Sequence, residues 1–493
     1  MSDNAIFLGK SEKPEELFLP MANRHGLVTG ATGTGKTVTL QIMAEGFCRM
    51  GVPVFAADVK GDLSGICMEG EPKDFLIERA KAIGFDDYGM EATPTIFWDL
   101  FGQQGHPIRT TVTEMGPLLL SRFMGLSDAQ EGALNIAFRI ADKEGLALLD
   151  LKDLRALLKE LGERGKEITT EYGNVNAQTI GAIQRRLVVL EEQGGNSFFG
   201  EPALDITDLM RTTPNGRGYM NVLAADKLIN SPQLYATFLL WLMSELFERM
   251  PEVGDPEKPR LVFFFDEAHL LFAEAPAGLL QKIEQTVKLI RSKGVGIYFV
   301  TQNPLDIPES VLAQMGNRIQ HALRAYTPRE QKAVQTAAST FRPNPAFKTV
   351  EVITQLGKGE ALVSVLDLKG VPSMVERTMV RPPSSRMGPI TPEERQKIVK
   401  SSPVYGQYEE AVDRESAYEI LQKAAAERAE AAQKAKEEIE ALKAEKAEAR
   451  SSRGRDSATD RFVKNMAGGL GTTLARSVGN ALVRGILGGL TRK

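Results

Sequence analysis

The chain has 493 residues, of which 42% are hydrophobic and 25% are charged, a composition that excludes an intrinsically disordered protein and leaves room for about two or three domains. Its 60 Lys and Arg residues nearly balance 64 Asp and Glu residues. The net charge of −4 excludes nucleic-acid binding through an overall basic surplus and leaves only a local contact, such as a loop or a channel. Two cysteines exclude a disulfide scaffold, the N-terminus is too polar for a secretory signal, and the apolar runs are too short to cross a bilayer. We therefore expect a cytoplasmic protein.

Short apolar runs alternate with longer amphipathic stretches from about residue 20 to residue 380. Unbroken apolar runs are typical of strands buried on both faces of a parallel sheet, and the amphipathic stretches predict helices between them. The sequence therefore predicts an α/β fold with a mostly parallel central sheet. The expected strands are 26–29, 52–56, 261–265, 295–300 and 361–365, and the expected helices include 232–250 and 276–292.

A glycine-rich segment follows the first expected strand and opens a helix from Val38 to Phe47. Its glycines let backbone N–H groups reach phosphate oxygens, and the positive end of the helix adds to the attraction. Lys36 is expected to neutralise the β- and γ-phosphates of a nucleotide, and the Thr37 hydroxyl to ligate Mg²⁺. Because strand, loop and helix occur in this order, a glycine turn without a ligand is disfavoured. The expected nucleotide-binding residues are Gly30, Ala31, Thr32, Gly33, Thr34, Gly35, Lys36, Thr37 and Val38.

The next strand leads into Asp58-Val59-Lys60-Gly61-Asp62, at the same sheet edge as the phosphate loop. This segment fits either contact with the nucleotide or steering of the chain that follows it. Residues 105–215 then interrupt the alternation and are predicted to form an inserted helical subdomain, with helices at 127–143, 150–164 and 176–193.

Two adjacent carboxylates, Asp266 and Glu267, follow the strand 261–265 at the edge where ligands bind in such sheets. Asp266 is expected to hold Mg²⁺ through its water shell, and Glu267 to polarise a water for attack on the γ-phosphate. A kinase receives its nucleophile on the substrate, so the adjacent glutamate favours a hydrolase. Gln302, at the end of a further strand, suits a sensor of the γ-phosphate.

Arg291 precedes the strand 295–300 at the end of an expected helix. A guanidinium delivered to a neighbouring subunit's γ-phosphate contributes about 10³- to 10⁵-fold in rate. The spacing fits a surface arginine equally well, because the helix dipole favours a cation near a C-terminus.

The composition changes after residue 380. Residues 381–404 contain several prolines and are expected to form a linker. Residues 411–450 carry 13 alanines, 8 Lys or Arg and 10 Asp or Glu, which predicts a long helix that is solvated rather than part of a coiled coil. Residues 461–493 have six basic residues and no acidic ones, which fits either a patch for a membrane surface or anionic polymer, or a tail that orders on meeting a partner.

The combined motifs resemble those of the HerA-type ATPases, a branch of the RecA-like motors that also holds the FtsK-type translocases and the conjugative coupling ATPases. The resemblance covers residues 20 to 380 and rests on the phosphate loop, the Asp58-x-Lys60-Gly61 element, the segment 203–209, the 261–269 segment FFFDEAH with its strand, and the 291–304 segment RSKGVGIYFVTQNP. It is nearest to a bacterial subgroup with a charged C-terminal extension.

This resemblance implies a RecA-like P-loop NTPase that forms a hexameric ring, binds ATP and Mg²⁺ at subunit interfaces and pulls DNA through its pore. Arg291 would act in trans, with Arg318 as a second candidate, and the residues that act in cis would be Lys36, Thr37, Asp266, Glu267 and Gln302. Two departures weaken the expectation of a nuclease partner and of DNA processing. The phosphate loop begins at Gly30, which leaves no room for the usual N-terminal β-barrel, and Asn303 replaces the usual arginine after the sensor glutamine.

The expected division of the chain is a first part of the ATPase core (1–104), a helical insertion (105–215), a second part of the core (216–380), a linker (381–404), a charged helical arm (405–450) and a basic, glycine-rich tail (451–493). The favoured function is a DNA-stimulated translocase or helicase. The alternatives are an ATPase that remodels or docks a protein or membrane partner through residues 411–493, and a nucleotide-gated scaffold with negligible turnover.

Overall fold

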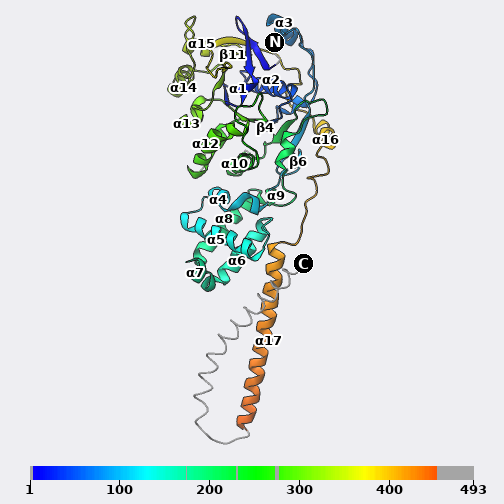
Figure 1. Ribbon diagram of the computed structural model, residues 1–493, viewed down its shortest axis with the longest axis vertical. Helices are drawn as coiled ribbons and strands as arrows, with labels where there is room; N and C mark the ends of the chain where they lie inside the picture. The colour runs from blue at the N-terminus through cyan, green and yellow to red at the C-terminus, as the bar shows by residue number, and fades with distance from the viewer. Residues whose placement is uncertain (1–3, 174, 229–230, 273–276, 452–493) are drawn as a thin grey trace. The chain divides into compact units, whose positions relative to one another are not determined.

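The computed structural model describes residues 4–173, 175–228, 231–272 and 277–451, so most of the expected basic tail lies outside the described residues. The chain divides into two compact units, Met1–Arg414 and Glu415–Lys493. Within the described residues, the first unit contains one sheet of 12 strands in the order β2-β1-β12-β11-β10-β3-β9-β8-β4-β7-β5-β6. Strands β4, β6 and β11 of this sheet are labelled in Figure 1. The strands are β1 Ala5–Lys10, β2 Pro14–Phe18, β3 Gly26–Thr29, β4 Val54–Asp58, β5 Thr95–Asp99, β6 His106–Pro107, β7 Met220–Ala224, β8 Leu261–Phe265, β9 Val295–Thr301, β10 Asn317–Gln320, β11 Glu360–Ser364 and β12 Glu376–Val380.

The strands from β10 to β6 in this order all pair in parallel, whereas β11, β12, β1 and β2 extend one edge in antiparallel fashion. The expectation of a mostly parallel α/β sheet is therefore confirmed. Parallel strands require crossover connections, and helices supply most of them here. The helices of this sheet region are α1 Leu19–Ala22, α2 Lys36–Arg49, α3 Asp74–Ala82, α10 Pro232–Arg249, α11 His269–Phe272, α12 Ala277–Leu289, α13 Glu309–Leu312, α14 Pro328–Ser339 and α15 Thr349–Gln355, with short 3₁₀ turns η1 Ser64–Cys67, η4 Ile290–Lys293 and η5 Pro304–Asp306.

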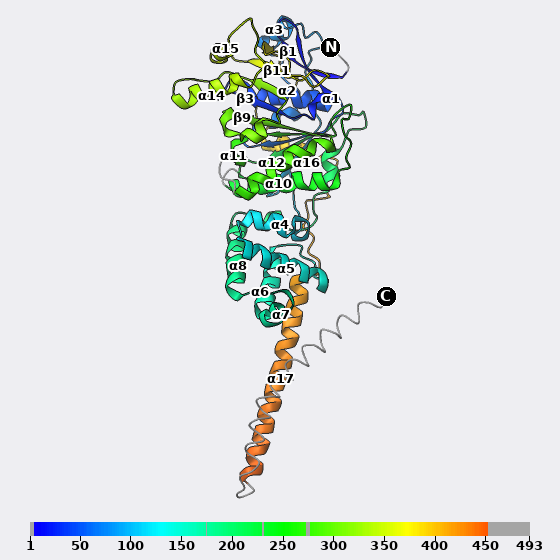
Figure 2. The same cartoon turned by 60° about the vertical axis from the view of Figure 1, so that its left-hand side comes forward.

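Apolar side chains fill both faces of the central strands, which explains their unbroken apolar sequences. Phe47 of α2 packs against Phe264 and Tyr298 on one face, and Phe272 of α11 packs against Phe299 on the other. Helix α2 lies on one side of the sheet, and α10 and α12 lie on the opposite side (Figure 2). Burial on both faces fixes the strands rigidly, so groups at their carboxyl ends are held by the core.

Helices fill the chain between β6 and β7 and lie within the expected insertion. They are α4 Val112–Met124, α5 Asp128–Glu144, α6 Leu151–Glu163, α7 Gly165–Tyr172, α8 Ala177–Glu192 and α9 Gly195–Phe198, followed by the 3₁₀ turn η2 Ile206–Met210. Helix α6 buries Leu154, Leu157, Leu158 and Leu161 at helical spacing and packs against α8. The insertion therefore has an apolar centre of its own.

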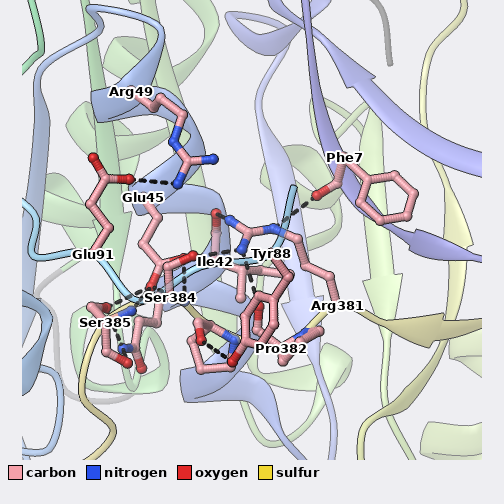
Figure 3. Close-up of polar contacts among 12 residues, drawn as sticks. Phe7, Ile42, Glu45, Arg49, Tyr88, Glu91, Arg381, Pro382, Ser384 and Ser385 are labelled. Carbon is pink, nitrogen blue, oxygen red and sulfur yellow. Dashed lines mark hydrogen bonds and ion pairs between the residues drawn. The ribbon is translucent and has the colours of Figure 1, made fainter. Parts of the chain in front are cut away.

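The segment that follows β12 differs from the expected linker, because it packs along the core. We call residues 381–413 the strap; it contains α16 Pro392–Lys400. At its start the buried Arg381 pairs with Glu45 of α2 at 3.1 Å, and the backbone N–H groups of Ser384 and Ser385 donate to the same carboxylate (Figure 3). Further along, Tyr408 donates a hydrogen bond to Asp208 at 2.5 Å.

The second unit is described as a single long helix, α17 Ala417–Ser451. Its scattered large apolar residues are partly exposed, among them Ile439 and Leu442 at 46% and 54%. Across the described parts of the chain, no helix combines the length and the apolar character that a membrane span requires.

Candidate nucleotide site

The phosphate loop connects the end of β3 to the start of α2 at the carboxyl edge of the sheet. Gly35 precedes α2 with φ of 120°, a left-handed backbone conformation that residues other than glycine rarely adopt. A Cβ atom at Gly30 would lie 2.5 Å from Cβ of His321. The Lys36 amine folds back over the loop and donates to the Ala31 carbonyl at 3.2 Å. Two N–H groups of the loop are used inside the protein, since that of Ala31 donates to the Ala322 carbonyl at 2.8 Å and that of Thr34 to the Ala31 carbonyl at 3.4 Å. The loop is thus a tight glycine-rich turn at the N-terminus of α2, and Lys36 lies beside it.

His321 lies against this loop, a position that the sequence analysis missed. Its Nδ1 contacts the Glu360 carbonyl at 3.0 Å, and its Nε2 contacts the Thr39 hydroxyl at 2.8 Å. Burial, together with the nearby Lys36 ammonium, lowers the pKa of His321 to about 4, so the ring is neutral at pH 7. A neutral ring has one N–H, which must be at Nδ1 because the carbonyl can only accept. His321 therefore ties the loop and α2 to β11.

Asp266 and Glu267 follow β8 directly and are both buried, at 6% and 4% exposure. Desolvation and the adjacent Glu267 raise the pKa of Asp266 to about 6, although Lys60 acts in the opposite direction. A buried carboxylate with this pKa is one that a divalent cation would stabilise. Carboxylate and hydroxyl oxygens are hard ligands of the kind Mg²⁺ prefers, so Asp266 and Thr37 fit a magnesium ion.

Donors from three parts of the chain surround the Glu267 carboxylate. Lys60 forms an ion pair with Oε1, and Gln302 Nε2 lies 3.3 Å from both carboxylate oxygens. His269 Nδ1 lies 3.2 Å from Oε2. The Thr32 hydroxyl of the phosphate loop in turn donates to Gln302 Oε1 at 3.1 Å. Burial alone would raise the pKa of Glu267, but the contacts with Lys60 and Gln302 hold it below its usual value.

The turn after β4 delivers Lys60 to this cluster. Asp58 accepts hydrogen bonds from the N–H groups of Gly61 at 2.8 Å and Leu63 at 3.2 Å, which fixes the turn. Desolvation, with Asp62 and Asp266 nearby, raises the pKa of Asp58 to about 7. In this structure Lys60 therefore contacts the glutamate, a pairing that the sequence analysis left open.

Arg291 and Arg318 lie away from this cluster. Arg291 lies in η4, immediately before β9, whereas the phosphate loop follows β3. Because the two strands are parallel neighbours, Arg291 lies at the amino ends of the strands and the phosphate loop at their carboxyl ends. Arg291 is 38% exposed at its side chain and pairs with Asp255 at 2.7 Å. Arg318 instead donates to the carbonyls of Met315 at 3.0 Å and Leu312 at 2.9 Å.

The parallel sheet, the phosphate loop before α2 and the carboxylates after β8 define the RecA-like P-loop NTPase fold. More particularly, the chain belongs to the Helicase HerA-like C-terminal family, whose pattern matches residues 3–493. The family expected from the motifs is thus confirmed.

The chain is also similar to a known protein and to two solved structures. The chain is 22% identical over 361 residues to the DNA double-strand break repair helicase HerA of Sulfolobus acidocaldarius, an alignment that covers 69% of this chain and spans only 62% of that protein. It resembles the solved structure of VirB4 of Thermoanaerobacter pseudethanolicus with a TM-score of 0.50 and 14% identity, over 77% of this chain and 97% of the other. It also resembles the bacterial conjugative coupling protein TrwB, with a TM-score of 0.49 and 15% identity over 77% and 91% of the two chains. At these identities, the likeness to VirB4 shows the fold.

Proposed function

We propose that the protein is a ring-forming ATP hydrolase that couples hydrolysis to movement on DNA, as a translocase or helicase. One observation carries the proposal: Lys36, Asp266, Glu267 and Gln302 come from three different crossover segments and meet at one edge of the sheet. Both a phosphate-binding loop and a buried carboxylate that can take a proton are thus available in one cluster. A scaffold with negligible turnover would need only the loop.

In this proposal each side chain has a separate task. The loop N–H groups and Lys36 bind the phosphates, and Thr37 and Asp266 would hold Mg²⁺, which would supply positive charge to the phosphate oxygens. Glu267 takes the proton of the attacking water on a carboxylate oxygen. Gln302 contacts both Glu267 and Thr32, so it links the state of the phosphate loop to the base. This link is consistent with the role of a γ-phosphate sensor.

The proposed assembly is a hexameric ring in which Arg291 serves the site of a neighbouring subunit. Its distance from the chain's own phosphate loop supports action in trans, since the whole length of β9 separates them. Arg318 is the weaker candidate, because two backbone carbonyls of its own chain already hold its guanidinium. The relative from Sulfolobus acidocaldarius, a helicase of DNA double-strand break repair, supports DNA as the polymer.

The test measures ATP hydrolysis with and without duplex DNA, for the wild type and for Glu267→Gln. We expect Mg²⁺-dependent hydrolysis that DNA stimulates and that rising salt suppresses, because phosphate contacts release counterions. Glu267→Gln should bind ATP but hydrolyse it about 10²- to 10⁴-fold more slowly. Glu351→Gln, on the exposed side of α15, is the matched control and should keep the wild-type rate.

Two results would redirect the proposal. Equal function of Glu267→Gln and the wild type would favour a nucleotide-gated scaffold. Hydrolysis that responds to liposomes or to a protein partner but not to DNA would favour the docking function of the C-terminal extension, in which α17 carries exposed Ile439 and Leu442.

A further inference from the structure

The orientation of the Glu267 carboxylate depends on the groups that contact it. Its backbone is left-handed, with φ of 48°, a conformation that non-glycine residues adopt at a cost. Its side chain is only 5% exposed, so solvent does not orient it. The orientation must therefore come from the donors that touch the two oxygens.

Among these donors, Lys60 brings a positively charged ammonium group to the carboxylate. Gln302 donates an amide N–H at 3.3 Å, which is near the long end of a hydrogen bond, whereas the Lys60 ammonium forms a charge-assisted contact with Oε1. Such contacts are about twice as strong as those between neutral groups. Lys60 thus gives Oε1 a charge-assisted contact, whereas Gln302 and His269 complete the set of groups around the carboxylate.

The segment that carries Lys60 is itself held in a defined turn. Gly61 has φ of 76°, Asp58 accepts the N–H groups of Gly61 and Leu63, and the Ser64 hydroxyl donates to the Gly61 carbonyl at 2.8 Å. The turn begins at the end of β4, which pairs with β8, the strand that Asp266 and Glu267 follow. Two neighbouring strands of the core therefore present the two partners to each other.

Lys36 and Lys60 have different partners although they lie close enough to influence each other's charge. Lys36 is buried over the phosphate loop and contacts Ala31. Lys60 is 43% exposed at its side chain and contacts Glu267. The two lysines thus serve different parts of the site.

We propose that Lys60 is a positioning residue, which holds the Glu267 carboxylate in the orientation that accepts a proton from the attacking water. This inference rests on the proposed ATPase function and deepens it. Misplacing a reacting group by about 1 Å costs about 10²-fold in rate, so loss of Lys60 should act on turnover. It should leave ATP binding intact, because Lys36 and the loop supply that.

The test compares Lys60→Met, Lys60→Arg, Glu267→Gln and the double variant Lys60→Met/Glu267→Gln in the full-length protein. For each, kcat and KM are measured with MgATP, and single-turnover rates are used for the slow variants. We expect Lys60→Met to lower kcat about 10²-fold with KM changed less than about twofold, and Lys60→Arg to recover most of the loss. In the Glu267→Gln background, Lys60→Met should cause no further loss.

Lys152→Met is the matched control, since Lys152 is 35% exposed at its side chain and pairs with Asp413 at 2.9 Å in the same unit. It should leave kcat and KM unchanged. An active wild type whose Lys60→Met variant keeps full kcat, or shows a raised KM instead, would overturn the inference and assign Lys60 to nucleotide binding or to neither task. An additive loss in the Glu267→Gln background would also overturn it. A loss of kcat in Lys60→Met that accompanies a lowered melting temperature and that Lys60→Arg does not restore would overturn it as well. A wild type without ATPase activity would instead refute the proposed function itself.

Discussion

His321 supports the phosphate loop through a neutral imidazole whose two nitrogens have different partners. We expect His321→Ala to raise KM for ATP about tenfold or more, because it removes the ring that lies against Gly35 of the loop and removes the partner of the Thr39 hydroxyl. His321→Asn, whose amide can still donate to the Glu360 carbonyl, should have a smaller effect. Steady-state kinetics of both variants checks this. Equal KM values for the two variants and the wild type would show that the loop keeps its shape without the ring.

Asp58 gives the fold a dependence on pH. Its pKa is raised to about 7 from an ordinary value of 3.8, so the folded protein holds this proton more tightly than the unfolded chain does. Below about pH 4 this carboxyl is protonated in the folded and in the unfolded protein. As the pH rises from about 4 through about 7, it ionises more readily in the unfolded chain, and the folded state becomes progressively less stable. We expect the melting temperature of the nucleotide-free wild type to fall over this range relative to that of Asp58→Asn, which does not ionise. Parallel melting curves for the two proteins at every pH would contradict the assignment.

The sequence predicted some site residues and missed others for a physical reason. Lys36, Asp266 and Glu267 belong to short local patterns in which strand, loop and helix follow one another, so their chemistry can be predicted without the fold. The contact of Lys60 with Glu267 joins residues 207 positions apart, and that of His321 with Thr39 joins residues 282 positions apart. Such contacts depend on the order of the strands, which periodicity does not determine.

The strap is attached to α2 by a buried ion pair. Arg381 and Glu45 are each 4% exposed at their side chains, and Arg381 also donates to the carbonyls of Phe7 and Ile42 (Figure 3). Removing one charge leaves the other buried without its partner, which typically costs about 3–5 kcal/mol. We expect Glu45→Gln and Arg381→Met each to lower the melting temperature by several degrees, as measured by differential scanning fluorimetry.

The same helix provides a control for this prediction. Arg49 of α2 pairs with Glu91, but their side chains are 44% and 39% exposed, and an exposed pair contributes about 0–1 kcal/mol. Arg49→Met should therefore change the melting temperature little. A similar, small change for Arg381→Met would show that the strap is not anchored through this pair.

The strap also shows where element prediction from sequence fails. The strands 26–29 and 261–265 were predicted with their observed limits, because an apolar run buried on both faces has a clear pattern. The segment 381–404 is rich in proline and polar residues, which is typical of a linker. Here the Glu45 carboxylate accepts the backbone N–H groups of Ser384 and Ser385, so a polar segment is buried at little cost.

At the scale of the whole molecule, the parallel direction of the strands determines which residues one subunit can contribute to its own nucleotide site. Glu267 and Lys36 lie at the carboxyl edge, and Arg291 lies at the opposite edge, where Asp255 neutralises it. Burial of β9 on both faces makes a movement of Arg291 across the sheet costly. The proposed hydrolysis therefore needs a second subunit to supply Arg291 to the site.

Mixed oligomers test this requirement most directly. Arg291→Ala and Glu267→Gln chains with different tags are co-expressed, co-purified through both tags and assayed for ATP hydrolysis beside each homogeneous variant. We expect both homogeneous variants to be nearly inactive and the mixed oligomer to regain activity, because about one interface in four combines an intact Glu267 with an intact Arg291 from the neighbour. A mixed oligomer as inactive as its parents, or an Arg291→Ala protein with the wild-type rate, would contradict completion of the site by Arg291 in trans.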